Sequence, residues 1–148
     1  MKLERMHLLN FRCFGDLTIE FHDKLTVIVA ENGAGKTALL DAVALGFGRN
    51  LSKLPGVKGQ TTKDSDLRIA KGERREPFLR LAWEAHTHDG GQLVWSGGRR
   101  RDAAVSMMII KRRLAAHGNV AFTRDLKAMD DYAVQLIDDE LEGRAFEF

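Results

Sequence analysis

One eight-residue stretch constrains this chain more than any other. Residues 30–37 read AENGAGKT, which matches the phosphate-binding pattern G-x-x-x-x-G-K-[ST] except that Ala30 stands at the first glycine position. An apolar run, KLTVIVA, precedes it over residues 24–30, and large apolar residues recur at helical spacing after Lys36. A strand, a glycine-rich turn and a helix in this order predict an α/β protein with a P-loop.

The chemistry of such a loop assigns a role to each residue type. Backbone N–H groups around Gly33 to Thr37 are expected to surround a β-phosphate, assisted by the positive end of the following helix. Lys36 is expected to reach the β- and γ-phosphates, and the Thr37 hydroxyl to bind Mg²⁺. Gly33 and Gly35 provide backbone freedom and room for phosphate, whereas alanine fits at position 30 if its φ is negative. The candidate ATP-binding residues of the loop are Asn32, Gly33, Ala34, Gly35, Lys36, Thr37 and Ala38.

Composition narrows the class of protein further. A chain of 148 residues with 44% apolar and 30% charged residues suits a single globular domain. Cys13 is the one cysteine, which excludes an intramolecular disulfide and a cysteine-based zinc site. The N-terminus lacks an apolar signal core, and no apolar run approaches the ~20 residues that cross a bilayer. We therefore expect a cytoplasmic protein without a membrane span.

The rest of the chain divides into recognisable segments. Residues 1–51 are expected to hold strands, the P-loop and its helix, residues 52–77 a loop or insertion, and residues 78–148 a β-hairpin and two helices. The apolar periodicities predict these elements: strands over 1–11, 17–21 and 24–30, a helix from Lys36 that frays at Gly46 and Gly48, a hairpin of 78–85 and 93–95 about the turn 89–91, and helices over 102–116 and 123–142.

A second motif near the N-terminus allows a family resemblance. Residues 10–14 read NFRCF, and an amphipathic strand and LTVIVAENGAGKTALLDAV follow. This opening resembles that of SMC/RecF-type ABC ATPases, and within that group the bacterial AAA family ATPases of the OLD and anti-phage-defence kind. The resemblance implies the N-terminal half of an ABC/SMC-like ATPase head with an antiparallel β-subdomain. It also implies ATP and Mg²⁺ as cofactors, Arg12 near the bound nucleotide, a homodimer or partner chain, and work on DNA.

The motifs that complete such an ATPase are not found in this sequence. Hydrolysis in this group needs a Walker B strand ending in Asp-Glu and a signature motif at a helix start. Residues 94–98 contain Ser-Gly-Gly, yet they follow a hairpin strand and are interpreted as a turn. Residues 134–140 end in Asp-Asp-Glu, but their apolar residues continue a helical stripe begun at Leu126. We therefore expect ATP binding without efficient hydrolysis by this chain alone, and its catalytic residues are not assigned.

Two other functions remain open from the residues themselves. A small self-contained P-loop kinase would explain the basic residues between 99 and 113, although NFRCF and two strands ahead of the loop fit it poorly. A non-enzymatic binding fragment that pairs with another chain is the other alternative.

Weaker signals favour structural roles over functional ones. The basic run Arg99, Arg100 and Arg101 is a candidate phosphate contact for DNA or RNA, or a solvated turn, or a partner for the acidic residues 125–148. Four further residues are interpreted conservatively: Gln60 and Gln92 as solvated rather than Mg²⁺-sensing, and His86 and His88 as a surface pair rather than a metal site. Trp83 and Trp95 are expected to pack against each other across the hairpin.

Overall fold

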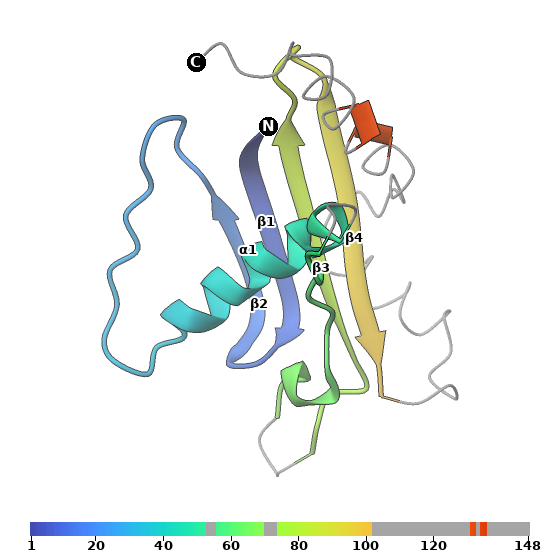
Figure 1. The fold of residues 1–148 in the computed structure, drawn as a ribbon. Coiled ribbons are helices and arrows are strands. Elements are labelled where there is room, and N and C mark those ends of the chain that lie inside the picture. The colour runs from blue at the N-terminus through green and yellow to red at the C-terminus, as the bar shows by residue number, and fades with distance from the viewer. Residues whose placement is uncertain (53–55, 70–73, 102–130, 133, 136–148) are drawn as a thin grey trace.

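In the part of the chain that the structure describes, a four-stranded antiparallel sheet packs against one long helix (Figure 1). The computed structural model describes residues 1–52, 56–69, 74–101, 131, 132, 134 and 135. The strand order is β2-β1-β3-β4. The elements are β1 (Lys2–Phe11), β2 (Phe14–Glu20), α1 (Lys36–Leu51), the short 3₁₀ turn η1 (Asp64–Asp66), β3 (Phe78–His86) and β4 (Gln92–Arg100). The predicted antiparallel β-subdomain is confirmed.

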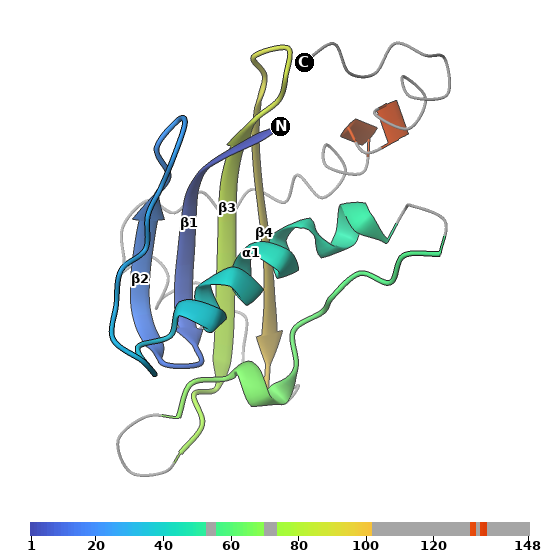
Figure 2. The same ribbon diagram turned by 60° about the vertical axis from the view of Figure 1, so that its left-hand side comes forward.

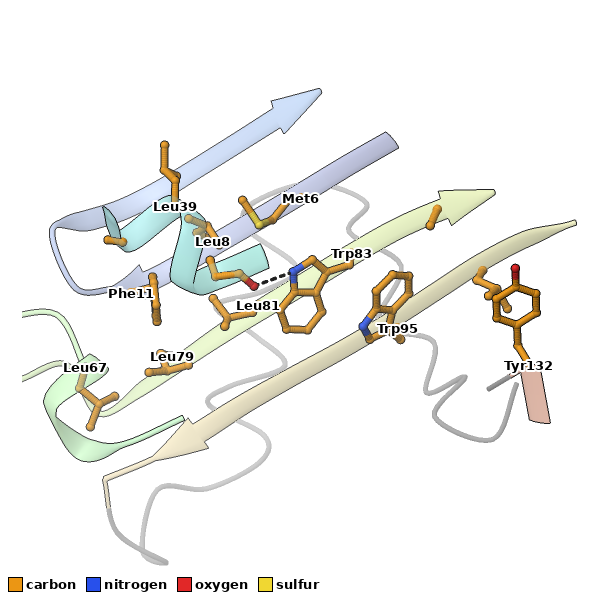
Figure 3. Close-up of a cluster of buried hydrophobic side chains, with 14 residues drawn as sticks. Met6, Leu8, Phe11, Leu39, Leu67, Leu79, Leu81, Trp83, Trp95 and Tyr132 are labelled. Atoms are coloured by element: carbon orange, nitrogen blue, oxygen red, sulfur yellow. Dashed lines mark hydrogen bonds between the residues drawn. The ribbon is translucent and has the colours of Figure 1, made fainter. Parts of the chain in front are cut away.

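Helix α1 crosses one face of this sheet obliquely (Figure 2). The apolar side chains that meet it alternate along each strand, as the period of two in a pleated strand requires. Met6 stands opposite Trp83, which stands opposite Trp95, so one row of large side chains spans three strands. With Leu8, Leu81 and the inner side of α1, they form a single buried cluster (Figure 3).

Two indole rings attach the helix to the sheet. Trp83 and Trp95 stack with ring centroids 5.8 Å apart, which confirms the predicted cross-hairpin pair. Their Nε1–H groups donate to carbonyl oxygens of α1, Trp83 to Ala42 at 3.1 Å (dashed in Figure 3) and Trp95 to Gly46 at 2.9 Å. Since buried indole N–H groups need an acceptor, these bonds fix where the helix lies.

The end of α1 corrects the sequence prediction. Gly46 and Gly48 were expected to mark its fraying end, but the helix continues to Leu51. Both glycines instead permit close approach. A Cβ at Gly46 would lie 2.7 Å from the Trp83 ring, and one at Gly48 would lie 2.6 Å from the Gln60 carbonyl oxygen.

The apolar run over residues 24–30 is the larger correction. It was expected to be a central strand covered on both faces, yet it joins no strand of the described sheet and runs outside it between β2 and α1 (Figure 1). Leu25 and Val27 are each 70% exposed and Val29 is 88% exposed. The physical reason is that a strand needs a neighbour for its backbone groups, and the described residues place none beside it.

The second hairpin is longer than its sequence pattern suggested. The turn at Asp89-Gly90-Gly91 is confirmed, with the Thr87 N–H donating to the Gly91 carbonyl at 2.8 Å. However, Ser96, Gly97 and Gly98 do not form a turn as expected, because they continue β4 to Arg100 opposite β3. Position 98 requires glycine because a Cβ there would lie only 2.7 Å from the Leu79 carbonyl oxygen.

The two C-terminal helix predictions fall mostly outside the described residues. The helix predicted over 102–116 lies entirely outside them. Within the one predicted over 123–142, the described residues 131, 132, 134 and 135 are helical, and Tyr132 packs in the core. Among the described residues, no helix has both the length and the apolar character to span a bilayer.

Candidate nucleotide-binding site

The glycine-rich turn has the backbone that the sequence predicted. Gly33 and Gly35 have φ of +86° and +100°, values that favour glycine, and α1 begins directly afterwards at Lys36. The non-glycine residues with positive φ in the described chain are Asn10 and Arg12, so Ala30 keeps a negative φ. The departure from the motif at Ala30 is therefore tolerated by the backbone.

The lysine of the motif lies folded over its own loop. Its Nζ donates to the Ala30 carbonyl at 2.5 Å and the Glu31 carbonyl at 2.8 Å. No acidic residue stands in the first turn of α1, so the positive end of the helix is not neutralised there. An ammonium group and an uncompensated helix N-terminus together favour a bound anion. Thr37 beside them is exposed, as a ligand for Mg²⁺ must be, whereas Ala38 is buried in the core.

The two sequence motifs meet in space. A Cβ on Gly35 would lie 2.6 Å from the Cys13 Sγ and 2.6 Å from the Phe14 ring. The turn between β1 and β2 therefore packs directly against the glycine that precedes Lys36. This contact requires glycine at position 35 for space as well as for its φ. It also brings NFRCF into contact with GAGKT, from which it is separated in the sequence.

Arg12 binds two carboxylates from elements distant in sequence. Its Nε donates to Asp66 Oδ1 at 2.9 Å, and its Nη1 donates to Asp41 on α1. Burial alone would lower the pKa of Arg12, but the hydrogen bonds to Asp41 and Asp66 outweigh it and raise that pKa. The Arg12 N–H also donates to the Asp66 carbonyl at 2.8 Å. Arg12 thus links the β1–β2 turn, α1 and η1.

The backbone at this turn is held in an unusual conformation. Asn10 and Arg12 have φ of +55° and +49°, a region that costs a non-glycine residue about 1–3 kcal/mol. Surrounding contacts hold the turn: the Arg68 N–H donates to the Asn10 carbonyl at 2.9 Å, and Phe11 bridges to Leu67. The strain is concentrated where the turn faces the P-loop.

A polar cavity of about 540 Å³ opens beside α1 next to this network. Ligand pockets commonly have volumes of roughly 300–1,000 Å³. Its polar lining includes Arg12, Asp41, Lys58, Gln60, Lys63 and Asp66. Sequence reasoning missed Asp41, Lys58, Lys63 and Asp66, because no local pattern marks them and only the folded loop brings them to Arg12. Gln60 is exposed in this loop, as predicted.

The other candidates lie away from the P-loop. Arg99 donates through Nε to Asp64 and through Nη1 to the Thr62 carbonyl at 3.1 Å, at the β4 edge of the sheet. Gln92 is exposed but begins β4 instead of lying in a loop. His86 Nδ1 lies 2.8 Å from Glu4, and His88 Nδ1 lies 3.3 Å from the Tyr132 hydroxyl. In the described part of the chain, no three potential ligands gather into a metal site.

Comparisons with known proteins agree with this geometry. The AAA domain family model matches residues 5–141. The Rad50 ATPase for DNA double-strand break repair from Methanopyrus kandleri is 34% identical over 102 residues, covering 68% of this chain and 10% of Rad50. The DNA replication and repair protein RecF from Psychromonas ingrahamii is 45% identical over 51 residues, covering 34% of this chain and 14% of RecF.

A solved RecF–ATP structure of the RecFOR pathway shares the fold. It superposes with a TM-score of 0.50 at 21% identity, covering 67% of this chain and 24% of that RecF chain. The chain spans between a tenth and a seventh of the two curated relatives named above. The chain thus resembles the N-terminal part of SMC/RecF-like ABC ATPases and has a P-loop ATPase-like fold.

Proposed function

The chain belongs to the AAA domain family, and from that premise we propose that it binds ATP with Mg²⁺ at the turn and helix start formed by residues 32–38. The observation that carries this proposal is the loop itself: two glycines with positive φ lead into α1, which begins at Lys36 and has no acidic residue in its first turn. Backbone N–H groups of the loop bind the phosphates, Lys36 neutralises the β- and γ-phosphates, and the Thr37 hydroxyl binds Mg²⁺.

Binding of a phosphate requires Lys36 to change partners. Its ammonium group now donates to the Ala30 and Glu31 carbonyls, both of which are weaker partners than a phosphate anion. In the complex, Lys36 therefore turns from these carbonyls to the phosphates. Arg12 stays with Asp41 and Asp66, so the proposal gives it a positioning role beside the nucleotide.

A nucleotide titration tests the proposal on the whole chain. Fluorescent ATP with Mg²⁺ should bind the parent, and Lys36→Ala should weaken binding at least ten-fold because it removes the cation facing the phosphates. Lys24→Ala removes an exposed cation outside the loop and serves as the matched control. Equal binding by the parent and Lys36→Ala would refute this assignment of the site.

Cys13 supplies an independent readout of the same site. Its exposed thiol touches Gly35, so a bound nucleotide should slow its reaction with a thiol reagent. Protection should appear with ATP and Mg²⁺ in the parent and disappear in Lys36→Ala. Labelling of Cys13 at an unchanged rate with saturating ATP would place the nucleotide elsewhere.

The exposed run over residues 24–30 supports a partner chain. We propose that a strand from another polypeptide, which also supplies the Walker B acid and the signature motif, pairs with this segment. Its β-branched residues, exposed and outside the ladders of the described sheet, are suited to strand addition. The resulting dimeric ATPase would act on DNA in the cytoplasm, in repair or in defence against phage.

Two measurements distinguish an ATPase that needs a partner chain from a self-contained enzyme. The purified chain alone should hydrolyse ATP at the background rate, and robust turnover would contradict the need for a partner. Val27→Asp combined with Val29→Asp should abolish self-association or partner capture without lowering ATP affinity. These two side chains are exposed and lie before the P-loop.

A further inference from the structure

Asn32 is the one asparagine in the sequence that precedes a glycine. In asparagine deamidation, the backbone nitrogen of the next residue attacks the side-chain carbonyl carbon and closes a cyclic imide. Glycine at the second position favours this reaction, because it has no Cβ to obstruct the approach and its backbone turns freely. Every other asparagine precedes a large or β-branched residue, whose side chain obstructs the approach.

The structure leaves both reacting groups of this pair accessible. Asn32 and Gly33 are exposed at the centre of the turn before α1, which the Ala34 N–H closes by donating to the Glu31 carbonyl at 3.2 Å (Figure 1). Gly33 has a φ of +86°, and a Cβ added to it would meet no atom within 4 Å. Among the described residues, none forms a hydrogen bond with the Asn32 side chain or the Gly33 N–H. The turn therefore does not hold the amide away from the nitrogen that attacks it.

The Asp89-Gly90 pair offers the opposite case within the same chain. Aspartate before glycine reaches the same cyclic imide, but here both reacting groups are held. The Gly90 N–H donates to the Thr87 carbonyl at 3.2 Å. The Asp89 carboxylate accepts from the Thr87 hydroxyl and, at 3.4 Å, from the Gly91 N–H. The bond from Thr87 also lowers the pKa of Asp89, which keeps its carboxylate ionised and less open to attack.

We propose that Asn32-Gly33 is a site of spontaneous deamidation that inactivates the nucleotide-binding loop. The Gly33 nitrogen attacks the side-chain carbonyl carbon of Asn32 and loses its proton, and the side-chain nitrogen leaves as ammonia. Water then opens the cyclic imide at one of its two carbonyls, which gives aspartate or isoaspartate. Water is the only co-reactant, so the reaction proceeds in the isolated chain.

Either product places a carboxylate beside the proposed phosphate site. The first turn of α1 holds no acidic residue, and a carboxylate at position 32 would compete with phosphate for Lys36 and for the loop N–H groups. It would also repel the phosphates directly. Isoaspartate in addition lengthens the main chain by one carbon, which displaces the N–H groups that follow. This consequence rests on the proposed ATP site, whereas the deamidation itself does not.

The first measurement follows the chemistry without nucleotide. The full chain is incubated at mildly alkaline pH, either folded or unfolded in guanidinium chloride. Peptide mapping by mass spectrometry, with labelling by isoaspartyl methyltransferase, quantifies the products at residues 32 and 89. Folding should slow the reaction at Asn32 by no more than about three-fold, and at Asp89 by about ten-fold or more. Protection of Asn32 equal to that of Asp89 would overturn the proposal.

The second measurement follows the consequence for nucleotide binding. Fluorescent ATP with Mg²⁺ is titrated into fresh and aged parent, and the fraction of protein that binds should fall in step with the fraction modified at Asn32. Asn32→Gln can close only a larger, slower-forming ring, so it should keep its own starting value over the same time. Asn32→Asp makes one product directly and should bind about ten-fold more weakly than the fresh parent, or worse.

The two measurements fail separately. A fresh parent that binds no ATP would refute the ATP site and the inactivation with it, while modification at Asn32 would still be read from the peptide map. A parent that binds ATP equally well before and after modification would refute the inactivation alone. Saturating ATP with Mg²⁺ should also slow the reaction at Asn32 and leave that at Asp89 unchanged, because phosphate then occupies the loop. An unchanged rate at Asn32 would count against a nucleotide bound there.

Discussion

Helix α1 and the run over residues 24–30 are both rich in apolar residues, yet the fold treats them in opposite ways. Ala38, Leu39 and Ala42 of α1 are buried against the sheet. Leu25, Val27 and Val29 are exposed, although they lie only a few residues earlier. Local hydrophobicity does not account for this difference.

The difference lies in where each segment finds hydrogen-bond partners. A helix satisfies its interior backbone groups within itself, so α1 needs from the sheet only an apolar surface and two indole donors. A strand depends on a neighbour for every bond of its ladder. The same burial tendency is therefore fulfilled in α1 but not in residues 24–30, which join no strand of the described sheet.

The first prediction compares one side chain that packs against α1 with one from residues 24–30, and its expected effect is the largest. Trp83→Ala should lower the free energy of unfolding by about 3–5 kcal/mol, since it removes a core ring that is 3% exposed. Val29→Ala, at a position 88% exposed, should change it by no more than about 0.5 kcal/mol. Urea unfolding of both variants measures this. A Val29→Ala cost above that of Trp83→Ala would show that residues 24–30 are buried in solution.

A second prediction tests the contact between α1 and the sheet at Gly46. Alanine in a helix interior normally stabilises by about 0.5–1 kcal/mol relative to glycine. Here Gly46→Ala should instead destabilise by about 1–3 kcal/mol, because its Cβ would lie 2.7 Å from the Trp83 ring.

A double-mutant cycle isolates that cause. In a Trp83→Ala background the obstructing ring is gone, so the added methyl group should become neutral or stabilising. Urea midpoints of the four proteins measure the coupling. An equal cost in both backgrounds would exclude the Trp83 contact as the reason for glycine.

A third prediction concerns the ion pairs of Arg12 with Asp41 and Asp66, which link the β1–β2 turn to α1 and η1. Arg12→Ala should lower the free energy of unfolding by roughly 1–3 kcal/mol, because Asp66 is buried and would lose its cation. Arg12→Lys keeps the charge but not the two-carboxylate geometry and should recover part of the loss. If Arg12→Ala left stability unchanged and weakened only ATP binding, Arg12 would be a nucleotide ligand, as the family resemblance implies.

The smallest effect is expected at the exposed Asp64–Arg99 pair. The hydrogen bond from Arg99 lowers the pKa of Asp64 below its usual value of 3.8. A lowered folded-state pKa gives stability that is present above pH 3.8 and is lost as the pH falls through the lowered value. Asp64→Asn should therefore differ slightly from the parent in urea midpoint at pH 7, and the difference should vanish at low pH. A difference that grows on acidification would contradict this account.

Sequence patterns alone predicted most of the sheet and the nucleotide loop. The alternation of apolar residues predicted β2, and the mixed apolar and polar residues 1–11 were interpreted as the strand that is β1. Asp89-Gly90-Gly91 predicted the hairpin of β3 and β4. The glycines of GAGKT predicted the turn before α1, where both have positive φ. These features are local, so a short stretch of sequence carries the information.

The failures share one physical cause, which is dependence on distant neighbours. Residues 24–30 have a strand pattern without a described partner, and Gly46 and Gly48 resemble helix stops but accommodate Trp83 and Gln60. The cavity beside Arg12 also depends on residues brought together from different segments.

The sequence by itself determined the glycine-rich turn that leads into α1, because Gly33 and Gly35 allow the positive φ values that this turn requires. Only the tertiary structure decided what stands around that loop: Cys13 and Phe14 against Gly35, and Asp41 and Asp66 on Arg12. Backbone turns follow from nearby residues, whereas ion pairs and surfaces arise from segments that meet only after folding.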